Sequence, residues 1–193
     1  MTADSYQHPD AIVTTEWLAD HLDDPGLRIF ECTMKLVYEP GSPVRSINQR
    51  DAFDAGHIPG AGYFDLQADL SDNESSFRFT MPPPAALATI LAGRGVGDGT
   101  RVVLYSRDSL QWSTRVWWML RAIGFDNAAV LDGGWSTWIA EGRPISTEGC
   151  AYGPETLNVK PRPALFVGPD AVQAAINDTA VCTINALTPD IHS

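Results

Sequence analysis

The residues best placed for chemistry lie in one short stretch of the chain, between positions 102 and 120. Its apolar start, residues 102–105, predicts a buried strand, and its end predicts an amphipathic helix with Ser113 as N-cap. A short loop between a strand and a helix can bind an anion, because the first backbone N–H groups of a helix have no partner within it. We therefore predict an anion-binding loop formed by Ser106, Arg107, Asp108, Ser109, Leu110 and Gln111.

A loop of this kind usually surrounds a nucleophile, and its first residue is Ser106. Ser106 lacks the G-x-S-x-G surroundings of a hydrolytic serine, and no histidine lies near it in the sequence, which favours an ordinary loop residue. Arg107 either binds an anionic substrate or is a solvated charge. Asp108 either opposes an anion or occupies the loop itself by accepting backbone N–H bonds.

The composition of the chain argues against two classes of binding partner, nucleic acids and membranes. The 193 residues carry a formal net charge of −11, which argues against a nucleic-acid partner, because phosphate binding needs clustered Lys and Arg. No apolar run approaches the roughly 20 residues that a membrane span needs, and the start of the chain lacks the apolar core of a secretory signal. We expect no membrane partner and a cytoplasmic location.

Cysteines and histidines give no sign of a metal or a cofactor. The three cysteines, Cys32, Cys150 and Cys182, are far apart and include no C-x-x-C, so neither a zinc site nor a disulfide framework is expected. Cys32 ends a predicted strand and is expected to be buried and inert. The four histidines show no metal-ligand spacing. We predict that His57 fixes a turn by bonding backbone groups.

The elements that must position the loop alternate between strands and helices. This order predicts an α/β domain with a mainly parallel sheet, and such sheets bind ligands at the carboxyl ends of their strands. Gly133 and Gly134 are expected to form a tight turn with positive φ. Strands are predicted in LRIFECTM, AGYFDL, RVVLY and AAVLDGGW, and helices in VTTEWLADHL, RDAFDA, PAALATILAGRGV, the segment TRVWWMLRAI after the Ser113 N-cap, and WSTWIAEG.

The C-terminal part of the chain has a different character. Residues 142–166 contain four prolines and little periodicity, so we predict a linker over residues 146–165. The sequence that follows, residues 166–187, aligns without gaps with residues 12–33 at an offset of 154 residues, so that Val167 falls on Val13. A tandem duplication explains the alignment, and chance similarity between two helix-then-strand units is the alternative. Under duplication, residues 166–193 are the truncated start of a second repeat.

Two motifs carry a family resemblance. GHIPGA, residues 56–61, preceded by RDAFDA, resembles the first signature of rhodanese domains, and LDGGWSTWIAEGRPI, residues 131–145, resembles the segment that closes the same domain. The stretch between them resembles the N-terminal half of two-domain thiosulfate or 3-mercaptopyruvate sulfurtransferases. The resemblance implies a rhodanese-like α/β domain over residues 1–145, with a five-stranded parallel sheet flanked by helices.

The resemblance also implies a sulfur-transfer chemistry. In rhodaneses a cysteine thiolate at the first loop position attacks the sulfane sulfur of a donor, holds it as a persulfide and passes it to an acceptor such as cyanide. In this chain the corresponding residue is Ser106, whose oxygen forms no stable persulfide. The chain resembles the N-terminal halves that lack the cysteine, so we expect no catalytic residue in it. The alternative is a catalytically inactive rhodanese-like binding or regulatory module.

The same resemblance implies partners for the chain. They are the missing C-terminal rhodanese half and, in the full-length parent, a small sulfur-containing anion. In the two-domain family a residue near Met34 faces the active site of the other half, so Met34 is expected to form one wall of an inter-domain pocket. Ser106→Cys should produce a thiol whose pKa is lowered by the anion-binding loop, unless the Asp108 carboxylate raises it again.

Overall fold

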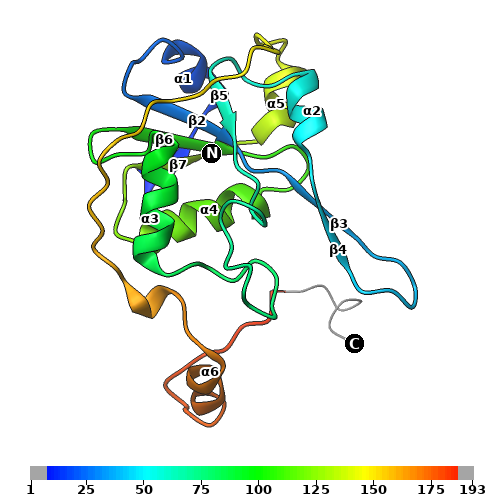
Figure 1. Cartoon of the computed structure of the whole chain (residues 1–193), viewed down its shortest axis with the longest axis vertical. Helices are drawn as coiled ribbons and strands as arrows, with labels where there is room; N and C mark the ends of the chain where they lie inside the picture. The colour runs from blue at the N-terminus through cyan, green and yellow to red at the C-terminus, as the bar shows by residue number, and fades with distance from the viewer. Residues whose placement is uncertain (1–7, 187–193) are drawn as a thin grey trace. The chain divides into compact units, whose positions relative to one another are not determined.

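The computed structural model describes residues 8–186 (Figure 1). The chain divides into two compact units, one up to Pro161 and one from Arg162 onward. The first unit contains a five-stranded sheet whose neighbouring strands are all parallel, which confirms the predicted α/β fold. The strand order across the sheet is β1 (Ile12–Val13), β7 (Ala128–Leu131), β6 (Arg101–Tyr105), β2 (Leu27–Glu31) and β5 (Ala61–Tyr63).

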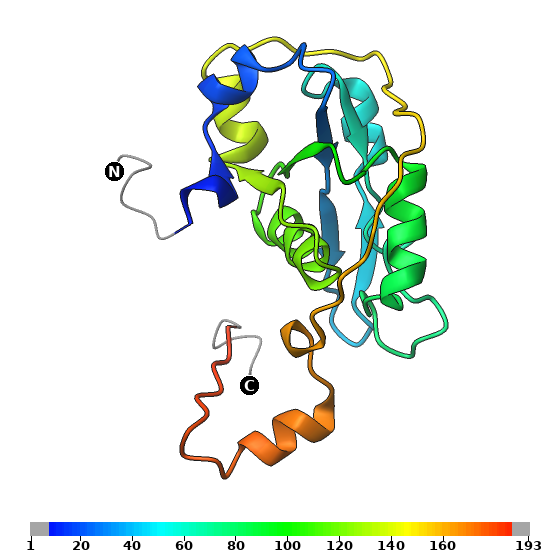
Figure 2. The same cartoon turned by 90° about the vertical axis from the view of Figure 1, so that its left-hand side faces the viewer.

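Helices cover both faces of this sheet (Figures 1 and 2). One face carries α1 (Thr15–Asp20), α2 (Arg50–Ala55) and α5 (Gly134–Ala140), whose side chains share a core with alternate residues of the strands. The other face carries α3 (Pro84–Gly93) and α4 (Gln111–Ala122), and α4 packs against β6 and β7. None of the helices in residues 8–186 is long and apolar enough to cross a membrane.

A two-stranded antiparallel hairpin extends from the carboxyl end of β2 (Figure 1). It consists of β3 (Met34–Val37) and β4 (Arg45–Asn48), with Met34 opposite Asn48. The single strand expected over LRIFECTM is therefore two strands, which belong to different sheets and are separated by Cys32 and Thr33.

The start of α4 differs from the prediction. The helix begins at Gln111, and Leu110 before it already has helical backbone angles of φ −64° and ψ −14°. Ser113 is therefore inside the helix, not its N-cap, and its hydroxyl donates to the carbonyl of Leu110 at 3.0 Å. By contrast, Thr14 is a true N-cap, since its hydroxyl accepts a hydrogen bond from the backbone N–H of Trp17 at 3.1 Å.

Residues 146–161, here called the strap, follow an extended path along the first unit (Figure 2). The strap is held by separate backbone hydrogen bonds. The N–H of Glu155 donates to the carbonyl of Ala92 at 2.9 Å, and the N–H of Lys160 donates to the carbonyl of Ile123 at 2.8 Å. Much of the segment expected to be a linker is thus packed onto the domain that precedes it.

The second unit contains the short η3 (Pro163–Leu165) and α6 (Pro169–Ala175). The helix expected at the start of a second repeat is present, but residues 176–186 form no strand. A strand needs a neighbouring strand to take its backbone hydrogen bonds, and this unit offers none in its described part. Residue 187 and the residues after it lie outside the described part of the chain.

Candidate functional site

The β6–α4 loop, residues 106–110, lies at the carboxyl end of β6. Of the six residues predicted for the anion-binding loop, five form it and Gln111 begins α4. Ser106 is 2% exposed, and its hydroxyl donates to the carbonyl oxygen of Ser109 at 2.7 Å. The Ser106 Oγ also lies 3.1 Å from the Oγ of Ser113. The hydroxyl proton of Ser106 is therefore engaged inside the loop itself.

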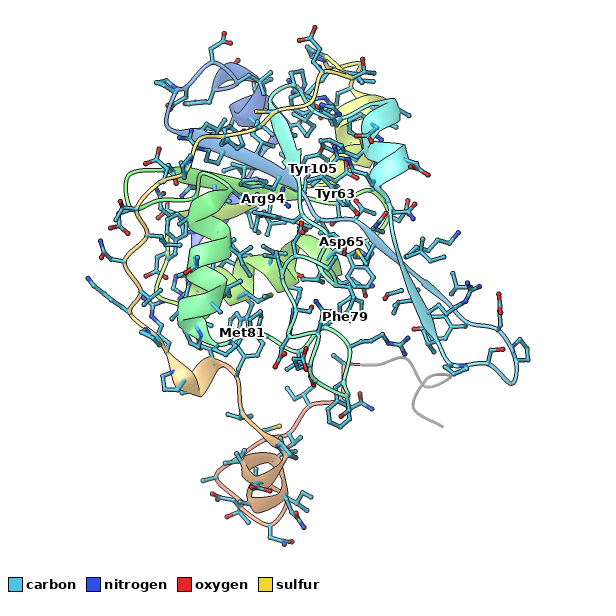
Figure 3. The ribbon with its side chains drawn as sticks, in the orientation of Figure 1. Tyr63, Asp65, Phe79, Met81, Arg94 and Tyr105 are labelled. Carbon is cyan, nitrogen blue, oxygen red and sulfur yellow. The ribbon has the colours of Figure 1, made fainter. Side chains whose placement is uncertain are left out.

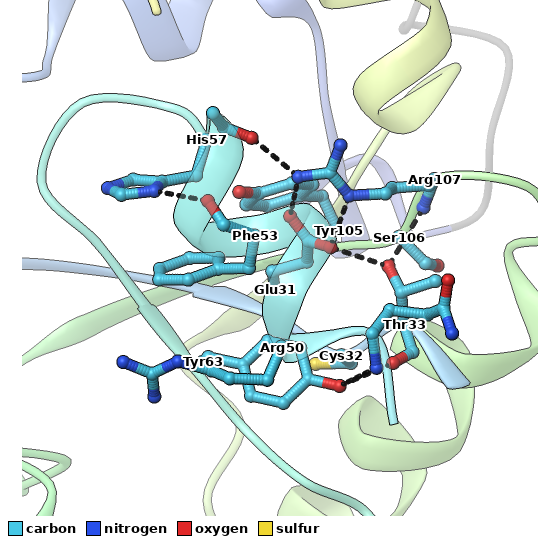
Figure 4. A network of polar contacts seen from close by, with 12 residues as sticks. Glu31, Cys32, Thr33, Arg50, Phe53, His57, Tyr63, Tyr105, Ser106 and Arg107 are labelled. Atoms are coloured by element: carbon cyan, nitrogen blue, oxygen red, sulfur yellow. Dashed lines mark hydrogen bonds and ion pairs between the residues drawn. The ribbon is translucent and has the colours of Figure 1, made fainter. Parts of the chain in front are cut away.

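Arg107 turns its side chain inward, toward β2. Its Nε lies 2.7 Å from Oε1 of Glu31 and its Nη2 lies 3.0 Å from Oε2, which makes a two-pronged ion pair (Figure 4). Nη2 also donates to the carbonyl of Gly56 at 2.6 Å, and the guanidinium lies 4.5 Å from the ring centre of Trp135. The Arg107 side chain is 14% exposed and that of Glu31 is fully buried. Arg107 is therefore not the solvated loop charge that the sequence allowed.

The backbone of Arg107 is held as well as its side chain. Its N–H donates to Oγ1 of Thr33 at 3.1 Å, and its carbonyl accepts from the hydroxyl of Ser136 at 3.0 Å. The Thr33 hydroxyl in turn donates to Glu31 at 2.9 Å. Three segments of the chain, at the ends of β2 and β6 and within α5, thus meet at one residue.

Two tyrosines border this polar network (Figures 3 and 4). Burial, and then the charge of Glu31, raises the pKa of Tyr105 well above its ordinary value. Burial also raises the pKa of Tyr63, whose hydroxyl donates to the carbonyl of Thr33 at 2.7 Å. Both phenols are therefore neutral near neutral pH and act as hydrogen-bonding groups, not as bases.

Glu31, Thr33 and Tyr105 were not among the residues predicted for the site. One signal in the sequence pointed to Glu31. It ends the apolar strand LRIFE two positions after Ile29, so the alternation of a strand places both side chains on the same buried face. A carboxylate on such a face needs a cationic partner.

The tip of the loop is exposed to solvent at Asp108, Ser109 and Leu110. Within residues 8–186 no N–H group donates a hydrogen bond to the Asp108 carboxylate. Asp108 therefore does not occupy the loop in place of a bound anion. Anion binding by the loop stays a prediction.

The fold agrees with the family comparison. Residues 14–141 match the family model of the rhodanese-like domain. The chain belongs to the rhodanese family. The match begins just before α1 and ends just after α5, so it includes all the strands of the sheet except β1.

Several curated relatives of the chain are sulfurtransferases. The chain is 30% identical to a thiosulfate sulfurtransferase of Bos taurus over 189 residues, which are 95% of this chain and 56% of the relative. It is 34% identical to a 3-mercaptopyruvate sulfurtransferase of Escherichia coli over 154 residues, 75% of this chain and 53% of the relative. The chain thus spans about half the length of the curated relatives it matches.

A solved rhodanese structure has the same fold. The crystal structure of the 3-mercaptopyruvate sulfotransferase SseA from Escherichia coli superposes on this chain with a TM-score of 0.72 at 30% identity. The superposition covers 86% of this chain and 61% of that one.

His57, in the rhodanese motif GHIPGA, has the structural role predicted for it. It is fully buried, with Nδ1 at 2.8 Å from the carbonyl oxygen of Phe53 and Nε2 at 3.0 Å from that of Glu148. Its backbone exchanges two hydrogen bonds of 2.9 Å with Ser146. His57 therefore joins the turn after α2 to the first residues of the strap.

The glycine pair of the second motif brings α5 against the β6–α4 loop. Gly133 and Gly134 have φ values of 69° and 54°, as predicted. A Cβ on Gly134 would lie 2.4 Å from the carbonyl oxygen of Ser106, so only glycine fits at that position. Trp135 then donates its backbone N–H to the same oxygen at 3.1 Å.

The cysteines of this rhodanese-like chain lie outside the loop. Cys32 is fully buried, and burial followed by the charge of Glu31 raises the pKa of its thiol well above the ordinary value, as expected of an inert cysteine. Cys150 is half-buried and Cys182 is exposed. Residues 8–186 contain no group of three His, Cys, Asp or Glu side chains that could hold a metal ion.

Met34 begins β3 and is 4% exposed in this chain. It follows Thr33, so it lies beside the polar network at the same end of the sheet. A role for Met34 as a wall of an inter-domain pocket stays a prediction.

Proposed function

We propose that this chain is the N-terminal, non-catalytic half of a two-domain sulfurtransferase. Its parent moves a sulfane sulfur from thiosulfate or 3-mercaptopyruvate to a thiophilic acceptor. The catalytic cysteine belongs to a C-terminal rhodanese half, which is the partner of this chain. The observation that carries the proposal is Ser106, which stands directly after β6 and cannot form a persulfide.

The distribution of thiols supports the non-catalytic assignment. A rhodanese nucleophile must be a thiolate within reach of its donor, and the low thiol pKa it needs comes from nearby N–H groups or positive charge. Cys32 is buried beside the Glu31 carboxylate, which opposes ionisation. Cys150 belongs to the strap and Cys182 to the second unit, and neither lies in the β6–α4 loop.

Two further observations support a second rhodanese half. The matched relatives are about twice as long as the segments that this chain covers. Residues 166–186 repeat the pattern of residues 12–32, yet Val172, Ile176 and Val181 are exposed. Of their counterparts in the first unit, Leu18 and Leu27 lie in its core and Leu22 packs against that core.

A thiocyanate assay tests the proposal. The purified chain is incubated with thiosulfate and cyanide, and thiocyanate is measured against a blank without protein. We expect no turnover above the blank. Turnover that is lost in Cys150→Ser or in Cys182→Ser would show that the chain carries its own nucleophile, and the proposal would be wrong. Adding a separately produced C-terminal rhodanese half should give turnover.

A further inference from the structure

We infer that Arg107 is a positioning residue that holds the β6–α4 loop closed to anions. Through its ion pair with Glu31 it keeps a carbonyl oxygen, and not an N–H group, facing the side chain at position 106. The inference rests on the proposed function. It gives a second reason why this half of a sulfurtransferase is inactive, besides the serine that stands in place of the catalytic cysteine.

The polar atoms that face position 106 inside the loop disfavour a negative charge there. The carbonyl oxygen of Ser109 lies 2.7 Å from the Oγ of Ser106. Within residues 8–186, no backbone N–H donates to that Oγ. A negative charge at position 106 would therefore meet the negative end of a carbonyl dipole, which opposes the formation of a thiolate or a persulfide there.

The first backbone N–H of the loop, that of Arg107, is already used in another hydrogen bond. The N–H of Arg107 is adjacent to position 106 and would be available to an anion there, but it donates to the Thr33 hydroxyl. Reorienting this N–H requires rotation of the peptide that joins Ser106 to Arg107. The carbonyl of Ser106 belongs to the same peptide and accepts from Trp135, so the rotation would break both hydrogen bonds.

The ion pair explains why the loop stays closed. Moving Arg107 would leave the fully buried Glu31 carboxylate without its cation, and an unpaired buried charge is strongly destabilising. The bond from Arg107 to the Gly56 carbonyl and the contact with Trp135 would be lost at the same time. The guanidinium is thus committed to the interior and is not available as a substrate anchor.

Alkylation of an introduced cysteine tests this inference. The background is the full chain with Cys150→Ser and Cys182→Ser, which leaves the buried Cys32 as the remaining native thiol. Ser106→Cys is compared with the triple change Ser106→Cys, Glu31→Gln and Arg107→Met, which removes both charges together. The matched control combines Ser106→Cys with Arg50→Gln and Asp54→Asn, because that ion pair, at 2.9 Å, is exposed.

Two readouts distinguish positioning from a purely structural role. The first is the pKa of the thiol at position 106, from the pH dependence of its alkylation rate. The second is the ratio of the rates with iodoacetate, an anion, and iodoacetamide, which is neutral. With the ion pair intact we expect a thiol pKa at or above the ordinary value of about 8.5 and a low ratio, as in the matched control. Without it, we expect the pKa to fall by about one unit and the ratio to rise ~10-fold.

Specific results would overturn the inference. Ser106→Cys with a clearly lowered thiol pKa and rapid reaction with iodoacetate would show that the loop binds anions with the ion pair in place. A triple variant with native circular dichroism but unchanged readouts would show that Arg107 does not set the loop. If the triple variant does not fold, the combination of Ser106→Cys, Glu31→Gln and Arg107→Gln applies the same criteria, because it removes both charges but keeps a polar side chain at each position. The thiocyanate assay on the unaltered chain is independent of all these outcomes.

Discussion

The hydroxyl of Tyr152 accepts a hydrogen bond from the backbone N–H of Ile29 at 3.0 Å, across 123 positions of the chain. It donates to the carbonyl of Gly60 at 2.5 Å. Ile29 and Ala61 are partners in the pairing of β2 with β5, so the tyrosine inserts at the point where this pairing begins. The ring packs edge-on against Phe30. The strap therefore satisfies backbone hydrogen-bonding groups at the start of this strand pair, although it contributes no strand to the sheet.

Removing this hydroxyl should destabilise the first unit. In Tyr152→Phe the N–H of Ile29 and the carbonyl of Gly60 lose their shared partner, and a buried polar group left unpaired costs about 1–3 kcal/mol. Urea unfolding measures the loss in the free energy of unfolding. The matched control is Tyr38→Phe in the hairpin, because Tyr38 is 58% exposed, and it should leave the free energy unchanged. Equal effects of the two changes would contradict this role of Tyr152.

Gly95 makes room for the strap, and Gly95→Ala should be costly. A Cβ there would lie 2.3 Å from the Cβ of Tyr152, and the φ of 85° is unfavourable for alanine. We expect a loss of ~2 kcal/mol or more in the free energy of unfolding. Gly93→Ala is the control, because a Cβ at that helical position meets nothing within 4 Å and should be neutral or slightly stabilising. Thermal unfolding of both variants gives the comparison.

Truncation should locate the true end of the first unit. A chain that ends at Ile145 lacks the whole strap, whereas one that ends at Pro161 keeps every residue of the compact first unit. We expect cooperative unfolding of the longer chain and weak or no cooperativity in the shorter one. Equal unfolding midpoints for the two truncated chains would show that the strap adds nothing to stability.

The attachment of the strap should weaken in acid. Hydrogen bonds from the backbone and the side chain of Asn158 lower the pKa of Asp98 below its ordinary value of 3.8. A carboxylate with a lowered folded-state pKa stabilises the fold above its unfolded-state pKa, and this contribution is lost as the pH falls through the folded-state pKa. The melting temperature of Asp98→Asn should therefore fall less steeply than that of the unaltered chain between about pH 5 and about pH 2.

A second variant tests whether this acid dependence comes from the contact between Asp98 and Asn158. Asn158→Ala removes the side-chain donor to Asp98 but leaves the backbone N–H in place, so it should reduce the acid dependence only in part. In the double variant the acid dependence should equal that of Asp98→Asn alone. An additive result would mean that the two residues act independently.

The sequence predicted most of the fold because its signals are local. Apolar runs such as Val102–Tyr105 and the glycine pair at Gly133 and Gly134 each specify their own conformation. β1 is only two residues long, too short to show any periodicity, so no strand was predicted there from the pattern of residues. The strap was predicted as part of a linker because it is held by single contacts at irregular spacing, which leave no periodic pattern.

The position of the candidate site was predicted from the sequence, but the contacts among its buried side chains were not. The location of Ser106 at the end of a parallel strand follows from strand and loop order. The pairing of Arg107 with Glu31 joins residues 76 positions apart and depends on the register of β2 with β6, which places Glu31 beside Tyr105. The strand pattern indicates that Glu31 needs a cationic partner, but no local pattern identifies Arg107 as that partner.

The packed strap also bears on how rhodanese modules can be exchanged between proteins. Recombination that cuts at Ile145, where the family motif ends, would separate the sheet from Tyr152 and leave Gly95 and its neighbours facing solvent. A breakpoint after Pro161 would move a complete folding unit. Gene fusion, duplication and laboratory domain swapping should therefore tolerate junctions beyond the strap and reject those within it.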